Sequence, residues 1–376
     1  MLTTETILAA ASHFDLGGIP VSIKEITTGN INTTYRLDMG ADHTPPRFVL
    51  QHINTSAFKD PVSLMENIGL ITEHIRKSYE AEGIVPTRRV LSYVKADNGT
   101  LLYTDSDNGA WRAYVYVDDV TAYNAIESTA IFREAGVGFG EFQTRLADFP
   151  AELLTETIPG FHNTALRFEA FLASVEKDVA GRASSVADEI EFFCARKELM
   201  SSIVKKLGNE FPLRVTHNDT KLNNVLMDNA TGQALCVIDL DTVMPGSALY
   251  DYGDAIRYGA CTAAEDEPDT SKIGFDMALF ESFTEGFVNA TAGNLTDTEI
   301  KHLPLGVAVI TCELAMRFMT DYLNGDVYFK TAYEGHNLVR ARAQIKLLQE
   351  VEAKLPEMYA FVEDMLTKQE RTNTKK

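Results

Sequence analysis

The 376-residue sequence is poor in cysteine and in positive charge, and each scarcity excludes a class of protein. The four cysteines, Cys194, Cys236, Cys261 and Cys312, lie far apart and form no C-x-x-C pair. This spacing speaks against structural zinc and against a disulfide framework. The 34 basic residues are outnumbered by 54 acidic ones, which gives a formal charge of −20. Because phosphates repel so acidic a chain, we expect no nucleic-acid binding and no binding to anionic lipid.

Long hydrophobic runs and targeting signals are also scarce. The start of the chain has a short apolar run, but it carries Glu5 and no lysine or arginine, so it predicts a capped first helix rather than a signal peptide. The most apolar stretch, Leu303–Met316, is too short for a membrane span and contains Glu313. We therefore expect a cytoplasmic protein that does not bind membranes.

The sequence changes character at Val117. Residues 1–117 contain 10 basic and 13 acidic residues, a charge of −3, whereas residues 118–376 contain 24 and 41, a charge of −17. The first part has the content of a small α+β domain, with a helix predicted over Val62–Lys77. Its predicted strands are Val21–Ile26, Asn32–Met39, Arg47–Ile53, Thr100–Thr104 and Trp111–Val117.

The second part is mostly helical, with one short β segment, Leu213–Asp239. Helical spacing runs through Ala130–Leu146, Phe168–Val179, Asp188–Leu207, Asp276–Ala290 and Thr298–Leu323, and a long helix follows from about Leu338. Since a chain of this length favours at least two domains, we divide it into a small domain of residues 1–117 and a helical domain of residues 118–376.

The β segment concentrates polar groups between two apolar strands. Within 25 residues it holds His217, Asp219, Lys221, Asn224, Asp239 and Asp241. Phosphoryl transfer from a nucleotide needs a carboxylate that holds the attacking hydroxyl, and oxygen ligands that fix Mg²⁺ on the phosphates. A nearby lysine can neutralise the transferred group. The cluster therefore suits an enzyme that uses ATP and Mg²⁺.

The pattern H-x-D-x-x-x-x-N, followed by I-D-x-D, resembles the signature of the aminoglycoside phosphotransferase and choline kinase superfamily. This resemblance implies an α+β, protein kinase-like two-lobed fold with a small, mainly β N-lobe and a larger, mainly helical C-lobe. It makes Asp219 the catalytic base and Lys221 a phosphate contact. It also implies a metal set of Asn224, Asp239 and Asp241, in which Asp241 supports either the metal or the loop.

Further segments resemble the bacterial N-acetylhexosamine 1-kinases, and this similarity runs from about residue 7 to residue 365. The segments are residues 29–35, Arg214–Asp228, Ile238–Ser247, Thr284–Phe287, residues 316–323 and His336–Arg340. The resemblance implies ATP-dependent phosphorylation of the anomeric (C1) hydroxyl of N-acetylglucosamine or N-acetylgalactosamine. The sugar-binding residues that we predict from it are Asn32, Arg317, Asp321 and Tyr322.

The predicted nucleotide contacts come from the first 117 residues. They are Gly29 and Asn30 in a glycine-containing loop, and the backbone of Tyr116 and Val117, which could form a kinase-like hinge for adenine. Two positions depart from the expected patterns. Asn30 stands where N-acetylhexosamine 1-kinases often have histidine, and Gln51 stands where a protein kinase has its strand lysine.

Several of these residues also have ordinary structural interpretations. We expect His217 to hold the loop through hydrogen bonds rather than to do chemistry. Arg317 follows Glu313 by four residues, so the two could instead form a buried pair within one helix. The acidic run Glu265–Asp269 predicts a solvated loop, with a site for a cationic substrate as the alternative.

Three functions remain open at this point. The first is a sugar 1-kinase that binds ATP, Mg²⁺ and a small sugar. The second is a kinase of the same superfamily that acts on choline, homoserine, methylthioribose or an aminoglycoside. The third is a kinase-shaped binding protein without activity, which the presence of base, asparagine and metal aspartate disfavours. The sequence does not give the oligomeric state.

Overall fold

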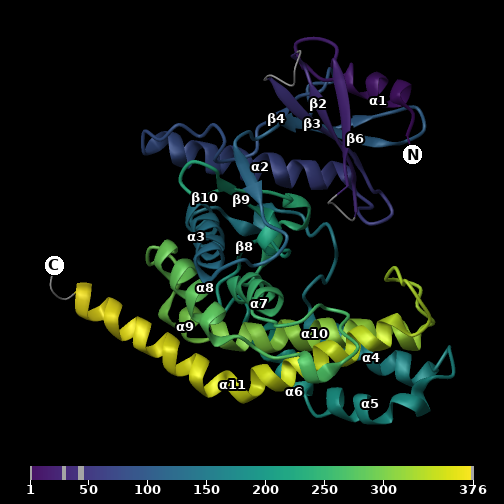
Figure 1. Ribbon diagram of the computed structural model, residues 1–376, viewed down its shortest axis with the longest axis vertical. Helices are drawn as coiled ribbons and strands as arrows, with labels where there is room; N and C mark the ends of the chain where they lie inside the picture. The colour runs from purple at the N-terminus through teal and green to yellow at the C-terminus, as the bar shows by residue number, and fades with distance from the viewer. Residues whose placement is uncertain (1, 28–30, 41–45, 374–376) are drawn as a thin grey trace. The chain divides into compact units, whose positions relative to one another are not determined.

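The structure is a computed structural model that describes residues 2–27, 31–40 and 46–373, and the side chains as far as Lys368. The chain forms two compact units (Figure 1). The first unit comprises Met1–Thr121, Glu152–Pro159 and Leu226–Met244, and the second comprises Ala122–Ala151, Gly160–Val225 and Pro245–Lys376. The division into functional domains at residue 117 stays a prediction.

An antiparallel sheet forms the frame of the first unit. Its strands run in the order β1 (Ser22–Ile26), β2 (Thr33–Asp38), β3 (Arg47–Ile53), β6 (Ala110–Val115) and β4 (Tyr93–Val94), and β5 (Tyr103–Thr104) also pairs with β6. The register sets Gln51 of β3 directly opposite Arg112 of β6. A second sheet has the order β10 (Ala234–Val237), β9 (Val225–Asp228) and β7 (Val120–Ala122).

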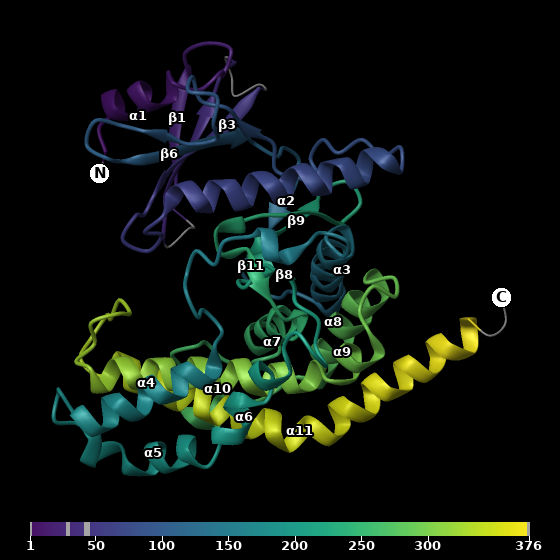
Figure 2. The ribbon, with the colours of Figure 1, turned by 180° about the vertical axis from the view of Figure 1, so that it is seen from behind.

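Two helices bury apolar side chains in the first unit. Helix α1 (Thr4–Ala11), capped by the Thr3 side chain, joins Ile7 to a core that includes Leu37, Leu50 and Trp111 of the sheet. Helix α2 (Pro61–Ala81) runs beside the sheet in both views (Figures 1 and 2). On α2 the buried Asn67 donates to the carbonyls of Thr155, at 2.8 Å, and Val243, at 3.2 Å, and so ties the two later segments into this unit.

The second unit is built mainly from helices. In chain order these are α3 (Thr129–Arg145), α4 (Thr164–Lys177), α5 (Ala187–Cys194), α6 (Lys197–Ser201), α7 (Ala248–Gly259), α8 (Met277–Ala290), α9 (Asp297–Lys301), α10 (Leu303–Leu323) and α11 (His336–Asn373). Helix α3 packs on α8, and α10 packs on α4, α7 and α11 (Figure 2). Two short strands, β8 (Arg214–Thr216) and β11 (Met244–Gly246), pair with each other.

Helix α10 is the core helix of the second unit. It has 21 residues and, within the part of the chain that the structure describes, it is the one helix long and apolar enough to cross a membrane. The apolar stretch Leu303–Met316 is thus part of a longer helix, which continues to Leu323. Its packing explains its composition, since 78% of its most apolar window is buried inside the protein.

Most of the predicted elements are confirmed. The structure has strands at four of the five predicted positions with shifts of one or two residues, and β3 matches its predicted bounds. The predicted strand Thr100–Thr104 is reduced to β5, and the short strands β4 and β7 were not predicted. The predicted capped first helix is α1, and the predicted long C-terminal helix is α11.

Two predicted helices are interrupted. The helix predicted over Thr298–Leu323 breaks at His302, because Pro304 occupies the first turn of α10, where a proline is tolerated but cannot continue an earlier helix. The helix predicted over Asp188–Leu207 ends at Cys194 and restarts at Lys197. At this break the Arg196 guanidinium binds the Phe192 carbonyl and the Glu352 carboxylate. Helix α7 was not predicted.

Helices α7 and α10 approach each other closely through two glycines. A Cβ atom at Gly253 would collide with the backbone carbonyl of Gly306, and one at Gly306 would collide with the carbonyl of Leu249. Backbone atoms on two packed helices cannot move aside as the end of a side chain can. This contact therefore sets the distance between α7 and the core helix.

We predict that Gly253→Ala lowers the free energy of unfolding by about 1–3 kcal/mol, the usual cost of overpacking a core. Gly69→Ala, also within a helix, is the matched control, because its Cβ would meet only the end of the Leu101 side chain, at 3.1 Å. Helix propensity favours alanine at both positions. Urea unfolding of the two variants measures the difference, and equal stability would contradict the packing argument.

Candidate active site

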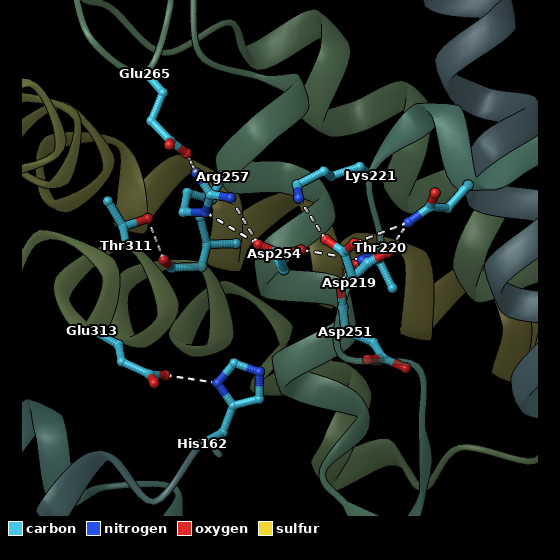
Figure 3. Close-up of polar contacts among 12 residues, drawn as sticks. His162, Asp219, Thr220, Lys221, Asp251, Asp254, Arg257, Glu265, Thr311 and Glu313 are labelled. Carbon is cyan, nitrogen blue, oxygen red and sulfur yellow. Dashed lines mark hydrogen bonds and ion pairs between the residues drawn. The ribbon is translucent and has the colours of Figure 1, made fainter. Parts of the chain in front are cut away.

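The loop after β8 brings together the predicted base and lysine of the second unit (Figure 3), and the predicted asparagine, Asn224, contacts the base. Asp219 Oδ1 lies 2.8 Å from Lys221 Nζ. Asn224 Nδ2 donates to the Asp219 carbonyl at 2.8 Å and to Asp219 Oδ2 at 3.2 Å. The amide nitrogen of Asn224 is thus used within the loop, and its amide oxygen is the atom suited to a metal.

The carboxylate of Asp251 clamps the backbone of this loop from helix α7. It accepts hydrogen bonds from the backbone N–H groups of His217, at 2.8 Å, and Asn218, at 2.7 Å, and from Gln143 Nε2, at 3.0 Å. Asn218 adopts a left-handed conformation with φ 64°, which few residues other than glycine adopt without support. The clamp supplies that support immediately before Asp219.

A second acid of α7 holds the other side of the loop. Asp254 Oδ2 accepts from the backbone N–H of Thr220 at 3.1 Å, while its Oδ1 accepts from Arg257 Nη2 at 2.9 Å. Burial alone would raise the pKa of Asp254, but the charges of Arg257 and Lys221 lower it below its ordinary value. Asp254 therefore stays ionised and adds a second negative charge near Lys221.

His217 is buried and has a structural role, as the sequence predicted. Its ring lies edge-on to Phe139 and Phe142, with centroids 5.6 and 5.8 Å away. Its Nδ1 accepts from the backbone N–H of Asp219 at 3.3 Å. The ring thus fills the core beneath the loop and fixes the residue that carries the predicted base.

Sequence reasoning missed Asp251 and Asp254. A signal was present, because two acids three residues apart follow the helix-capping Ser247 and therefore share one face of α7. Their partners, however, lie more than 30 residues earlier in the chain. Spacing within α7 could indicate the shared face but not the loop that this face binds.

The predicted metal ligand Asp239 belongs to the first unit, where it follows strand β10. It also has left-handed backbone angles, with φ 60° and ψ 57°. Its carboxylate is an oxygen ligand of the kind that Mg²⁺ prefers, with phosphate and water completing the shell. No group of three or more His, Cys, Asp or Glu side chains within the described ranges could hold a metal by itself. The Asp239 carboxylate by itself therefore fits a metal that arrives with phosphate ligands.

Asp241 is held by two other side chains of the first unit. Its Oδ1 forms a buried ion pair with Arg112, and its Oδ2 accepts from Asn32 Nδ2 at 2.5 Å. Asn32 Oδ1 in turn accepts from the backbone N–H of Asn54 at 2.9 Å. The sequence predicts Asp241 as part of the metal set and Asn32 as a sugar ligand. Their contacts with each other favour the alternative for Asp241, in which it supports its loop.

The predicted nucleotide contacts are only partly described. Gly29 and Asn30 lie outside the described residues. Tyr116 donates its backbone N–H to the Arg47 carbonyl at 3.0 Å, so this amide is already used within the unit. Val117, the other predicted hinge residue, is buried. The proposed hinge stays a prediction.

The second unit also contains a cluster of cationic and aromatic side chains around Glu313. His162 Nδ1 lies 2.8 Å from Glu313 Oε2, and Arg167 Nε lies 3.7 Å from Glu313 Oε1. Arg317 lies over the rings of Phe161, Tyr328 and Phe329, at 5.6–5.9 Å. The ion-pair partners of Glu313 thus come from the chain around α4, rather than from Arg317 within its own helix.

Asp321 and Tyr322, two predicted sugar ligands, hold the segment that follows α10. The Asp321 carboxylate accepts from the backbone N–H groups of residues 327, 328 and 329, at 2.8–2.9 Å. The Tyr322 ring lies under the Arg182 guanidinium, 4.5 Å from its centroid. Asp321 therefore fixes Tyr328 beside Arg317. Direct contact of either residue with a sugar stays a prediction.

The acidic run Glu265–Asp269 is used in contacts within the second unit. Glu265 binds Arg257 at 3.1 Å, and Asp266 binds His336 at 3.1 Å. Glu267 pairs with Lys272 at 3.3 Å, and Asp269 caps the turn at Ser271. These contacts explain the run without a cationic substrate.

With the fold and loop geometry described, the comparisons define the class. A profile described as "Phosphotransferase enzyme family" matches residues 22–276, more than half of the chain. The chain belongs to this family.

Three solved structures show the fold. A choline kinase from Cryptosporidium parvum Iowa II has a TM-score of 0.56 and 15% identity, covering 94% of this chain and 97% of that one. A spectinomycin phosphotransferase in complex with ADP and spectinomycin has a TM-score of 0.55 and 13% identity, covering 93% and 99%. A microcompartment-associated aminopropanol kinase has a TM-score of 0.52 and 14% identity, covering 95% and 99%. The predicted α+β, protein kinase-like fold is confirmed.

We predict that Asp251→Asn lowers the free energy of unfolding by about 1–3 kcal/mol, because an amide leaves one buried backbone N–H without an acceptor. Amide hydrogen exchange of residues 217–219 should accelerate as well. The control is Asp269→Asn, since the exposed Asp269 also accepts a backbone N–H, from Ser271 at 3.1 Å. There we expect a change within about 0.5 kcal/mol. Equal effects of the two substitutions would contradict the clamp.

Proposed function

We propose that the protein is an ATP- and Mg²⁺-dependent kinase that phosphorylates the anomeric (C1) hydroxyl of an N-acetylhexosamine. The observation that carries the kinase part is the arrangement of Asp219, Lys221 and Asn224 on one clamped loop of a phosphotransferase-family chain. The sugar part is supported by the resemblance to N-acetylhexosamine 1-kinases over most of the sequence, and by the charges in the second unit.

Asp219 is suited to hold the attacking hydroxyl and accept its proton. Its carboxylate is kept in place by Asn224 on one oxygen and by Lys221 on the other. Burial would lower the pKa of Lys221, but the charges of Asp219 and Asp254 raise it above its ordinary value. The ammonium group therefore stays charged and can neutralise the phosphoryl group as it transfers.

The nucleotide and metal follow from the same chemistry. The spectinomycin phosphotransferase with a similar fold was solved with ADP, which supports a nucleotide donor here. Asp239 and Asn224 are the residues that would hold Mg²⁺, and the metal would offset the negative charge of the phosphates. A metal ion would also explain how a protein with a charge of −20 can bind an anionic nucleotide, because the cation offsets the repulsion between carboxylates and phosphates.

The cluster around Glu313 supports a neutral acceptor over a cationic one. Burial lowers the pKa of Arg167, and the charge of Arg317 lowers it further, so the two guanidinium groups lie within electrostatic reach of each other. His162 is also within electrostatic reach of Asp251 and Asp254, the two acids of α7 that hold the loop. Positive groups there would repel a choline or an aminoglycoside, whereas their N–H donors suit hydroxyl and amide oxygens.

The second candidate is a kinase for another hydroxyl substrate. It is favoured by solved structures of similar fold, among them the choline kinase and the aminopropanol kinase. Its support in the sequence was the acidic run Glu265–Asp269. Because acids of that run form ion pairs with Arg257, Lys272 and His336, they are less available to bind a cationic substrate, and the second candidate loses that support.

We predict that Asp219→Asn lowers kcat by about 10²–10⁴-fold, the usual contribution of a general base. The fold and the affinity for ADP should stay unchanged, because asparagine keeps the size of the side chain and its oxygen can still accept from Lys221 or from Asn224. The control is Asp188→Asn, which changes an exposed aspartate of the same unit and should leave kcat unaltered. Turnover of the Asp219 variant near that of the control would refute the assignment.

The acceptor can be identified by ADP release with a panel of N-acetylhexosamines, hexoses, choline, homoserine, methylthioribose and aminoglycosides. We predict the highest kcat/KM for an N-acetylhexosamine. We also predict that Arg317→Met raises the KM for the sugar tenfold or more, a loss of about 1.4 kcal/mol. If the acceptor is instead a cation, the same variant should lower its KM, because a repulsive charge has been removed. That result would replace the proposal with the second candidate.

A further inference from the structure

Arg112 and Asp241 form a deeply buried ion pair in the first unit. Their side chains are 2% and 4% exposed. Arg112 lies on β6 of the large sheet, and Asp241 lies in the turn Leu240–Thr242 that follows the predicted metal ligand Asp239. The pair therefore joins the sheet to the segment that carries this ligand.

The pair is the centre of a network that crosses three strands. Arg112 Nε donates to Gln51 Oε1 at 2.8 Å, and Gln51 Nε2 donates to Thr34 Oγ1 at 3.0 Å. On the other side of the pair, Asn32 donates to Asp241 Oδ2 at 2.5 Å. Strand β6 thus contacts Asp241 through Arg112, and strands β3 and β2 are linked to Arg112 through Gln51 and Thr34.

Gln51 gives this network its form. At this position on β3 a protein kinase has a lysine, and here the cation Arg112 lies directly opposite on β6. The glutamine fixes the orientation of the guanidinium through Nε, and Nη1 then faces Asp241. The planar fork of arginine can make both contacts at once, which a lysine ammonium cannot do in the same geometry.

Stability alone is a poor explanation for such a network. Removing two charges from water costs about as much as the pair regains, so apolar residues would stabilise the sheet equally well. Asp239, however, has a left-handed conformation, which is uncommon for residues other than glycine and costs energy that fixed neighbours can offset. Anchoring Asp241, two residues later, enforces the turn that follows Asp239.

We propose that Arg112 is a positioning residue for the metal site. By holding Asp241 against the sheet, it fixes the turn after Asp239 and so presents the Asp239 carboxylate to Mg²⁺. In this arrangement Asp241 is a brace and does not ligate the metal. The inference rests on the proposed function only in requiring that the nucleotide binds together with a divalent metal.

The test measures nucleotide binding rather than turnover. Isothermal titration of the full chain with ADP, at a series of Mg²⁺ concentrations, gives the concentration that supports half-maximal affinity. We expect Arg112→Lys and Asp241→Asn each to raise that concentration tenfold or more, with the affinity for ADP without metal unchanged. In the double variant we expect the effect of one substitution, not the product of both, because the two act through one pair.

The control variant is Arg36→Gln. It breaks an ion pair with the fully buried Asp38 on β2 of the same sheet, where the two side chains lie 2.9 Å apart. A purely structural role for Arg112 predicts that this variant and Arg112→Lys both lose thermal stability and that neither changes the Mg²⁺ requirement. Hydrogen exchange without metal is a second readout. Residues 239–243 should exchange faster in Arg112→Lys than in the wild type or in Arg36→Gln.

The outcomes distinguish a failure of the positioning role of Arg112 from a failure of the proposed function. Unchanged Mg²⁺ dependence in both single variants, with a metal-dependent wild type, overturns the positioning role alone. Additive effects in the double variant also overturn it, because Asp241 would then act on the metal independently of Arg112. A wild type whose nucleotide binding ignores Mg²⁺ overturns this inference and the metal-dependent part of the proposed function together.

Discussion

The carboxylate of Asp251 holds the backbone of His217 and Asn218, and the position of Asp219 depends on this contact. The loop contains a left-handed residue, Asn218, immediately before the predicted base, and the Asp251 carboxylate holds its backbone N–H. Helix α7 supplies the compensating acceptors, Asp251 and Asp254. The close approach of Gly253 to α10 fixes α7 in turn. Within the second unit, the position of Asp219 therefore depends on helix α7, and the position of α7 depends on its packing against α10.

A net charge of −20 repels an anionic nucleotide unless the acidic side chains near it are paired or neutralised. The structure shows how several of these acids are used. Asp251 and Asp254 accept backbone N–H groups, Asp241 binds Arg112, and the run from Glu265 is paired with Arg257, His336 and Lys272. Acids that serve as internal acceptors do not repel a ligand as exposed ones do. Bulk charge is thus a weak guide to what such a protein binds, and the charges at the site decide.

The sequence predicted the loop that carries Asp219, Lys221 and Asn224 because these residues are local to one another. It also predicted the strands and most helices, whose signals are periodic over short stretches. It did not predict the contacts that hold these parts, because their partners are remote. Arg112 meets Asp241 across 129 positions, and His162 meets Glu313 across 151. For Glu313 the spacing even favoured the wrong partner, since Arg317 lies one helical turn away while His162 and Arg167 make the contacts.

The central claim is that this kinase places phosphate on the anomeric oxygen of a sugar, and the position of phosphate in the product tests it most directly. The product formed from ATP and an N-acetylhexosamine should be purified and examined by proton and phosphorus NMR. We predict a coupling between phosphorus and the proton on C1, and a single anomer. Phosphate on any other carbon, or a coupling to protons of a different acceptor, would contradict the account.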